Sequence, residues 1–257
     1  MEKMPKPSLI KKEEKVKEGN NLSFKLIKLL YEKSEKSICE IIKENGSGTG
    51  FFSKIKYKNN EIYCLITNNH VITEKMLNKE YIEIKINNKI KKIYLNKKKW
   101  TNKDLDYTCI EIIKDDDIDI LEIDDNCYDN ENENKEYNKK GIIMISINRD
   151  KEIEIPHGIL RYIEECDKFY HDCNTEKGYS GGPIILINNT KIIGMHCGYE
   201  IKVKKNVGIY MNEIIKDINK YNIIEGIINI KDDLLFNSEE EIEVEVYINN
   251  KKVKIKK

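Results

Sequence analysis

The chain has 257 residues, 39% of them hydrophobic and 35% charged, which is enough for one large domain or two small ones with a buried core. Its 45 basic and 45 acidic side chains cancel, so no global field recruits nucleic acid or an anionic membrane. Only two of the basic residues are arginines, Arg149 and Arg161, which removes the commonest reader of guanine edges.

The N-terminal sequence MEKMPKPSLIKKEEK lacks the apolar stretch of a secretory signal, and no apolar run approaches the roughly 20 residues of a membrane span. The seven cysteines are widely spread, and no CxxC pair suggests a zinc site. Most of them stand in apolar, strand-like runs, which is typical of buried reduced thiols. We therefore expect a cytoplasmic protein without a metal or other cofactor.

Residues 1–36 are predicted to be an N-terminal extension, disordered in its Lys/Glu-rich first part and helical over 22–35. Residues 37–117 then form a first β unit. Its β-rich runs, separated by polar or Asn/Gly breaks, predict six strands near 37–43, 49–57, 60–67, 80–86, 89–95 and 106–113. Six short strands with such turns are typical of a closed antiparallel barrel.

An acidic, Asn-rich linker is predicted over 118–140, and a second β unit with a C-terminal helix over 141–222. The strands of this second unit are expected near 141–147, 152–163, 167–172, 182–188, 190–197 and 206–211, and the amphipathic helix over 212–222. Residues 223–257 form a C-terminal extension with a hairpin, because apolar residues alternate on either side of Asn249-Asn250. The chain is thus predicted to be all-β, with two six-stranded barrels.

Glycines surround a serine in the segment Gly178-Tyr179-Ser180-Gly181-Gly182-Pro183. A serine hydroxyl is a poor nucleophile unless a base takes its proton and N–H donors stabilise the developing oxyanion. Flanking glycines allow a tight turn that presents such donors, and Gly178 and Ser180 have the spacing of an oxyanion pair. An ordinary Gly-rich turn has the same composition, so this segment alone leaves both interpretations open.

The spacing Gly178-x-Ser180-x-Gly182 also matches the nucleophile elbow of α/β-hydrolases, which places the serine between a strand and a helix. Here Pro183 and β-branched isoleucines follow, which favours a strand instead. The elbow also needs its histidine downstream, and only His196 lies there. The elbow interpretation is therefore disfavoured.

His70 is the candidate base, because it stands at the end of an apolar strand. Of two nearby acids, Asp106 fits better than Asp104, since it directly precedes the strand that follows. The order His70, Asp106, Ser180 is the chain order of chymotrypsin-type enzymes. Histidine and aspartate then belong to the first β unit and serine to the second, so the site is expected in the cleft between them.

Five segments in this order resemble the trypsin-like serine peptidases of the chymotrypsin fold over roughly 37–220. They are GTGFF (48–52), TNNHVI (67–72), DYTCIEI (106–112), GYSGGP (178–183) and IGMHCG (193–198). The resemblance is closest to the glutamyl endopeptidase and HtrA branch, which has short loops and no disulfide framework. It implies two chymotrypsin-like barrels and a serine endopeptidase that acts on polypeptides.

The resemblance also implies roles for individual residues. Ser180 attacks the scissile carbonyl, His70 acts as base and then acid, and Asp106 orients His70. Thr175, His196 and Gly198 line the pocket for the P1 side chain, which predicts a preference for Glu or Gln.

Two tyrosines depart from the family pattern. Tyr179 replaces the aspartate that precedes the nucleophile in trypsin, so activation by a freed N-terminus should be absent. Tyr199 follows Gly198 where relatives often have a second glycine, and could narrow the substrate groove.

Two other functions compete with the enzyme. A catalytically silent protein of the same fold could act as a peptide-binding or scaffold module, although silent relatives usually lose a residue of the catalytic set. Nucleic-acid binding through the Lys-rich segment 97–100 is disfavoured, because such a run is usually a solvated loop.

Overall fold

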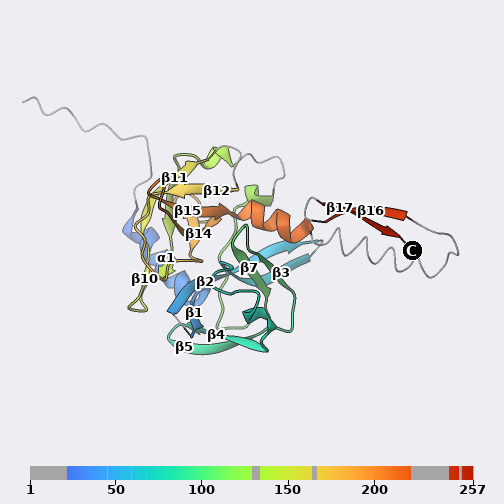
Figure 1. Cartoon of the computed structure of the whole chain (residues 1–257). Coiled ribbons are helices and arrows are strands. Elements are labelled where there is room, and N and C mark those ends of the chain that lie inside the picture. Colours follow the sequence, from blue (N-terminus) through green and yellow to red (C-terminus); the bar gives the residue numbers. More distant parts are fainter. Residues whose placement is uncertain are drawn as a thin grey trace, which may run out of the picture. The chain divides into compact units, whose positions relative to one another are not determined.

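The computed structural model describes residues 22–44, 46–58, 60–128, 134–163 and 167–220, together with the backbone of 243–248 and 251–256 (Figure 1). The described residues up to Lys216 form one compact unit, and those from Asp217 form a second. The predicted disorder of residues 1–20, and Cys166, lie outside the described residues.

The first half of the larger unit is a helix followed by an antiparallel sheet. Helix α1 (Phe24–Ser37) begins where the Ser23 side chain accepts a hydrogen bond from the Leu26 backbone N–H. Seven strands follow, in the spatial order β5-β4-β1-β2-β3-β7-β6. They are β1 (Ile38–Lys43), β2 (Gly46–Tyr57), β3 (Asn60–Thr67), β4 (Tyr81–Ile86), β5 (Lys89–Tyr94), β6 (Lys99–Asn102) and β7 (Tyr107–Glu111).

This sheet differs from the predicted six-stranded barrel in two ways. It has a seventh strand, β6, and among the described residues no ladder joins its outer strands β5 and β6. The Lys-rich segment 97–100 is therefore not simply a solvated loop. Trp100 is buried, and the centroid of its ring lies 5.0 Å from that of Tyr57. This one apolar contact packs the segment against the sheet, although its lysines are more typical of a loop.

The second half contains a closed six-stranded barrel in the order β11-β12-β15-β14-β13-β8, which confirms the predicted all-β fold with a barrel in this half. Helix 211–220 follows β15, close to the predicted 212–222. The barrel strands are β8 (Gly141–Met144), β11 (His157–Tyr162), β12 (Lys168–His171), β13 (Pro183–Leu186), β14 (Ile192–Glu200) and β15 (Lys205–Tyr210), and a hairpin of β9 (Ser146–Ile147) and β10 (Ile153–Glu154) lies beside them.

The acidic segment after β7 contributes to the core. Leu121 forms a bridge to Ser53 in β2, and Ile123 forms one to Ile192 in β14, so this segment connects the two halves. Ile118 and Cys127 are also buried. Short 3-10 helices lie at η1 (Met76–Asn78), η2 (Asp125–Tyr128) and η3 (Lys135–Tyr137).

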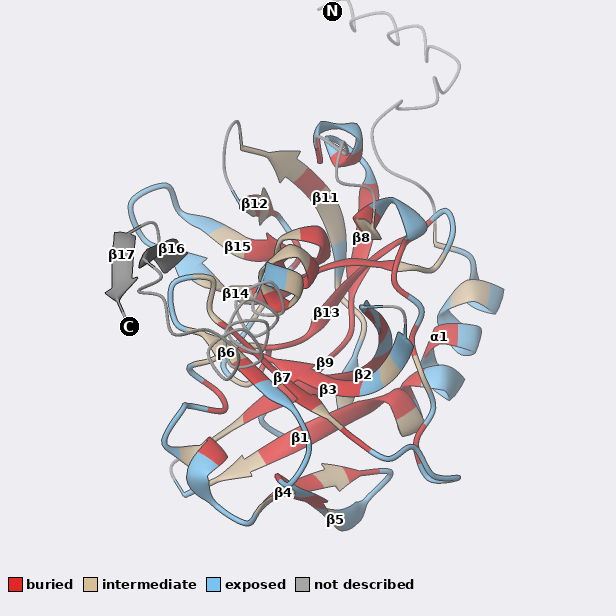
Figure 2. Ribbon diagram, turned by 90° about the vertical axis from the view of Figure 1, so that its right-hand side faces the viewer, coloured by how far each residue is buried: buried red, intermediate tan, exposed pale blue. Residues whose placement is uncertain are grey.

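Burial follows the two halves, with strands that are largely buried and an α1 helix that is largely exposed (Figure 2). Each half has its own apolar cluster, one around Phe52, Leu65 and Ile84, and one around Phe169, Ile184 and Tyr210. No helix among the described residues is long and apolar enough to cross a membrane.

The smaller unit contains an antiparallel hairpin of β16 (Glu243–Ile248) and β17 (Lys251–Lys256), with Val246 opposite Val253. This is the hairpin that the alternating apolar residues predicted. Its Asn249-Asn250 turn lies outside the described residues.

Candidate active site

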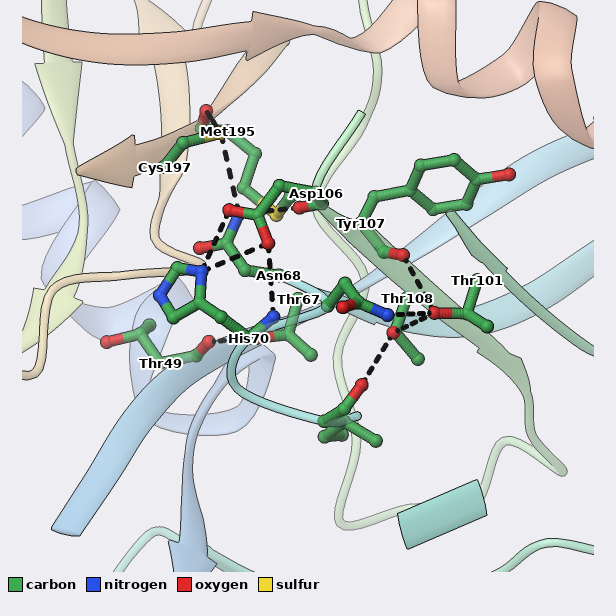
Figure 3. A network of polar contacts seen from close by, with 12 residues as sticks. Thr49, Thr67, Asn68, His70, Thr101, Asp106, Tyr107, Thr108, Met195 and Cys197 are labelled. Atoms are coloured by element: carbon green, nitrogen blue, oxygen red, sulfur yellow. Dashed lines mark hydrogen bonds and ion pairs between the residues drawn. The ribbon is translucent and has the colours of Figure 1, made fainter. Parts of the chain in front are cut away.

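His70 lies just after the end of β3 and Asp106 just before the start of β7, and their side chains meet there. The Nδ1 atom of His70 lies 2.8 Å from Asp106 Oδ2 and 3.0 Å from Oδ1, and the His70 backbone N–H donates to Oδ1 at 3.1 Å. The imidazole points toward the carboxylate (Figure 3). Its side chain is 48% exposed, against 21% for Asp106, so the pair is open to solvent on the histidine side. Asp104, the competing acid, is exposed and is not bonded to His70.

A buried asparagine holds the Asp106 backbone in place. Asp106 has φ 56°, in the left-handed region that aspartate tolerates better than most residues. Asn68 Nδ2 donates to the Asp106 carbonyl at 2.9 Å and lies 3.5 Å from Cys197 Sγ. The Asn68 carbonyl accepts from the backbone N–H groups of Val71 and Ile72, which shapes the turn that carries His70. One residue therefore fixes both members of the pair.

The Ser180 loop has the backbone conformation that its glycines allow. Gly178 has φ 106° and Gly181 has φ 90°, both in the region that disfavours side chains. A Cβ on Gly181 would stand 2.0 Å from the Thr49 carbonyl oxygen, so this loop packs directly on β2. Among the described residues, the N–H groups of Gly178 and Ser180 have no protein acceptor. They are free to donate to a bound group.

The same strand joins the serine loop to the histidine. The Thr49 backbone N–H donates to the Ser180 carbonyl at 2.9 Å, and the Thr49 carbonyl accepts from Thr67 Oγ1 at 2.7 Å. Thr67 ends β3, three residues before His70. The structure thus brings His70, Asp106 and Ser180 to one end of the sheet. No hydrogen bond joins Ser180 to His70 in the described part of the chain, and such bonds are often long before substrate binds.

Of the predicted pocket residues, His196 lies deepest. It is 3% exposed, and its Nδ1 is 3.0 Å from Nε2 of His171, which is also buried. Burial, with the neighbouring imidazoles of His171 and His70, lowers the pKa of His196 to about 3. Burial alone lowers the pKa of His171 to about 4. Both rings are therefore neutral near pH 7.

Thr175 and Gly198 are both linked to β15, the strand that pairs with His171 and His196. Thr175 Oγ1 donates to Asn206 Oδ1 at 2.8 Å, and Asn206 Nδ2 donates to the Cys173 carbonyl. The Thr175 proton is thus engaged, and its oxygen keeps lone pairs for a donor. Gly198 lies in β14 opposite Val207, and a Cβ there would meet nothing within 4 Å. The site is open at Gly198.

The two unusual tyrosines differ in their environments. Tyr179 is buried, and its hydroxyl donates to the Glu154 carboxylate of β10. Burial and this carboxylate raise the pKa of Tyr179, while the tyrosine and Asn148 lower the pKa of Glu154. Tyr199 is 56% exposed, so it stands at the rim of β14.

Sequence reasoning missed four residues that surround the site: Thr49, Asn68, His171 and Cys197. Thr49, Asn68 and Cys197 lie within matched motifs, but their contacts depend on segments far away in the chain. His171 is one of only four histidines, which is the single sequence signal that could have drawn attention to it. Burial and the Asp106 charge raise the pKa of Cys197 to about 12, so it remains a thiol.

The described residues contain no group of three His, Cys, Asp or Glu side chains that could hold a metal ion. The site thus combines a His–Asp pair that is open to solvent on the histidine side with a Gly-rich serine loop that has two N–H groups without a protein acceptor among the described residues. Its strands come from both halves of one unit.

Only the comparison with solved structures bears on the fold. No family model matches the chain, and no curated protein matches its sequence significantly. Among solved structures, a serine endoprotease from Yersinia pestis is 12% identical with a TM-score of 0.56. The matched region covers 78% of this chain and 68% of the endoprotease chain. The inactive form of the Rv3671c protease is 14% identical with a TM-score of 0.54, covering 74% and 94%. An inactive Ser343Ala mutant of Rv3671c from Mycobacterium tuberculosis H37Rv is similar, with 14% identity, a TM-score of 0.54 and coverage of 73% and 87%. The chain has the fold of chymotrypsin-like serine proteases.

Proposed function

We propose that this protein is a serine endopeptidase that cleaves polypeptides through an acyl-enzyme. In this proposal His70 removes the Ser180 Oγ proton as the oxygen attacks the scissile carbonyl, and then protonates the leaving amine. Asp106 accepts from Nδ1, which selects the tautomer whose Nε2 acts as the base and stabilises the cation that forms. The Gly178 and Ser180 N–H groups stabilise the oxyanion.

The observation that carries this proposal is the double contact between His70 and the Asp106 carboxylate, at 2.8 and 3.0 Å. Here both carboxylate oxygens face one ring nitrogen, while 48% of the histidine side chain stays exposed. The free N–H groups of the serine loop add the second requirement of acyl transfer.

A fluorophosphonate probe separates an enzyme from a silent binding module of the same fold. We expect the probe to label wild type at Ser180 and to leave Ser180→Ala unlabelled. His70→Ala should abolish labelling, whereas His157→Ala removes an exposed histidine elsewhere and should retain it. A folded wild-type protein that is never labelled would support the binding module.

The same site supports a P1 preference for Gln or Glu. One ring nitrogen of His171, Nδ1, is buried without a partner among the described residues. Burying an unpaired acceptor nitrogen costs less free energy than burying an unpaired N–H donor, so we place the His171 proton on Nε2. His171 Nε2 therefore donates to His196 Nδ1, and His196 Nε2 carries a proton. The His196 ring also bonds to the Val207 backbone, so in this proposal a P1 oxygen joins or replaces that partner. A neutral imidazole suits the amide of Gln at neutral pH, and Glu would bind better in acid.

The placement in the glutamyl endopeptidase and HtrA branch belongs to the same proposal, as does a cytoplasmic location. The branch rests on motifs rather than on the fold, since the fold neighbours are at most 14% identical. The location rests on cysteines in apolar, strand-like runs, which are typical of buried reduced thiols.

A further inference from the structure

Thr49, on β2, contacts the serine loop with both its backbone and its side chain. The residue is fully buried. Thr49 stands opposite Glu40 in the ladder of β1 and β2. On its other side, ladder pairing between β2 and β3 ends at Phe51 and Ile66, so the Thr49 backbone can bond beyond the sheet there. It uses this freedom to bind Ser180 through its N–H and Thr67 through its carbonyl.

The Thr49 hydroxyl makes two further bonds, both to the other half of the unit. Oγ1 donates to the Gly178 carbonyl at 2.9 Å and accepts from the Ile147 backbone N–H at 3.1 Å. Gly178 itself packs against Ile147, because a Cβ on it would stand 3.0 Å from the Ile147 carbonyl oxygen. The hydroxyl therefore lies at the junction of β2, β9 and the serine loop.

These bonds hold peptide planes that adjoin those of the oxyanion donors. The donor N–H groups belong to the 177–178 and 179–180 peptides, whereas Thr49 holds the carbonyls of the 178–179 and 180–181 peptides. The 178–179 plane lies between the two donor planes, so anchoring it restricts how both of them can turn. With both carbonyls anchored, rotation of the loop would break a buried hydrogen bond, and a buried polar group without a partner is costly. Preorganised donors of this kind need no rearrangement when the oxyanion forms.

We infer that Thr49 is a positioning residue, whose hydroxyl holds the serine loop so that its N–H groups point into the oxyanion hole. This role rests on the proposed peptidase activity. It touches neither substrate nor the reacting atoms, and acts through Gly178. Without the hydroxyl, the Gly178 carbonyl and the Ile147 N–H lose their partner, and the loop can turn its donors away from the site.

Thr49→Val tests this inference, because it keeps the shape and the backbone N–H and removes only the hydroxyl. We expect kcat to fall about tenfold to a hundredfold with KM nearly unchanged, since the lost interaction belongs to the transition state. A peptide boronate, which forms a tetrahedral anion on the serine, should bind more weakly by the same factor. Thr49→Ser restores the hydroxyl and should restore both values.

Ser53→Ala is the matched control. Ser53 lies on the same strand, is fully buried, and donates to a backbone carbonyl, that of Leu121, at 2.7 Å. Its loss should lower the Tm about as much as Thr49→Val does while leaving kcat and boronate affinity unchanged. Equal kinetic losses in the two variants would overturn the inference, because general destabilisation would then explain both.

Hydrogen exchange measures the loop itself and does not need activity. The Gly181 N–H donates to the His196 carbonyl and the Gly182 N–H to that of Tyr179. In Thr49→Val these amides should exchange faster, whereas Ser53→Ala should leave them unchanged. Unchanged exchange in Thr49→Val would overturn the inference even if wild type proved inactive. Full activity in Thr49→Val would overturn it while leaving the peptidase proposal intact.

Discussion

Two histidine pairs differ sharply within one compact unit. His70 is partnered by a carboxylate and keeps 48% of its side chain exposed. His196 is partnered by the imidazole of His171, and both of these rings are buried. The first pair combines a carboxylate beside the imidazole with access to solvent. The second cannot take up a proton without placing a positive charge in an apolar interior next to another imidazole.

The difference shows that the partner and the solvent decide what a histidine can do. A carboxylate stabilises the imidazolium that a general base must become, and solvent access lets the proton leave. A buried imidazole partner keeps the ring neutral and in one tautomer, which suits recognition of a polar side chain rather than proton transfer. Each of the following predictions tests one side of this comparison.

The largest effects are expected at the exposed pair and the serine. Ser180→Ala or His70→Ala should lower kcat by several orders of magnitude, and Asp106→Asn by about 10⁴-fold, because the tautomer of His70 is no longer held. Steady-state kinetics on a peptide library measure these losses, and circular dichroism checks the fold. Asp104→Asn is the control, since Asp104 is exposed and makes no bond to His70. Full activity in Asp106→Asn would remove the aspartate from the site.

The buried pair should control which bond is cleaved. Wild type is expected to cut after Gln or Glu, and His196→Ala should lower kcat/KM for such peptides by about a hundredfold, because the P1 oxygen loses its donor. Cleavage after other residues should change little. Mass spectrometry of a P1 library measures the profile. Cleavage mainly after Leu, Phe or Arg, or an unchanged profile in His196→Ala, would contradict the assignment.

The buried pair should also make the fold sensitive to acid. The pKa of His171 is lowered from 6.5 to about 4, so between these values the unfolded chain binds more protons than the folded one. Unfolding free energy therefore rises with pH across this window and falls on acidification, by about 3 kcal/mol at pH 3 for this group. His171→Gln should reduce this dependence in denaturant titrations without abolishing it, because buried His196 still has a lowered pKa, whereas exposed His157→Gln should preserve it in full. Identical acid slopes in the two variants would contradict the prediction.

A smaller effect is expected at the support of the exposed pair. Asn68→Ala removes the donor to the Asp106 carbonyl, and we expect kcat to fall about tenfold, the equivalent of one hydrogen bond. Asn69→Ala is a close control, because Asn69 donates to Thr101 rather than to Asp106. Steady-state kinetics of both variants measure the two values of kcat. Equal losses of kcat in both would contradict a specific role for the bond between Asn68 and Asp106.

Much of the fold could be predicted from local patterns. The strands β3 and β4 and the helix at 211–220 lie within two residues of their predicted bounds, because apolar alternation and Asn/Gly breaks marked them. Strand β6 was missed because a Lys-rich segment resembles a loop until Trp100 is seen to pack on Tyr57. The acidic segment near 118–128 was expected to be a linker, yet Leu121 and Ile123 bridge both halves.

The candidate site divides in the same way. The sequence by itself predicted His70, Asp106 and Ser180 as the candidate catalytic residues, because short motifs around a reactive side chain are recognised locally. Only the tertiary structure decided what surrounds them. Thr49 reaches Gly178 across 129 positions, and His171 meets His196 across 25. Such contacts depend on the register and closure of strands from different parts of the chain, and no local pattern of residues encodes a partner at that distance.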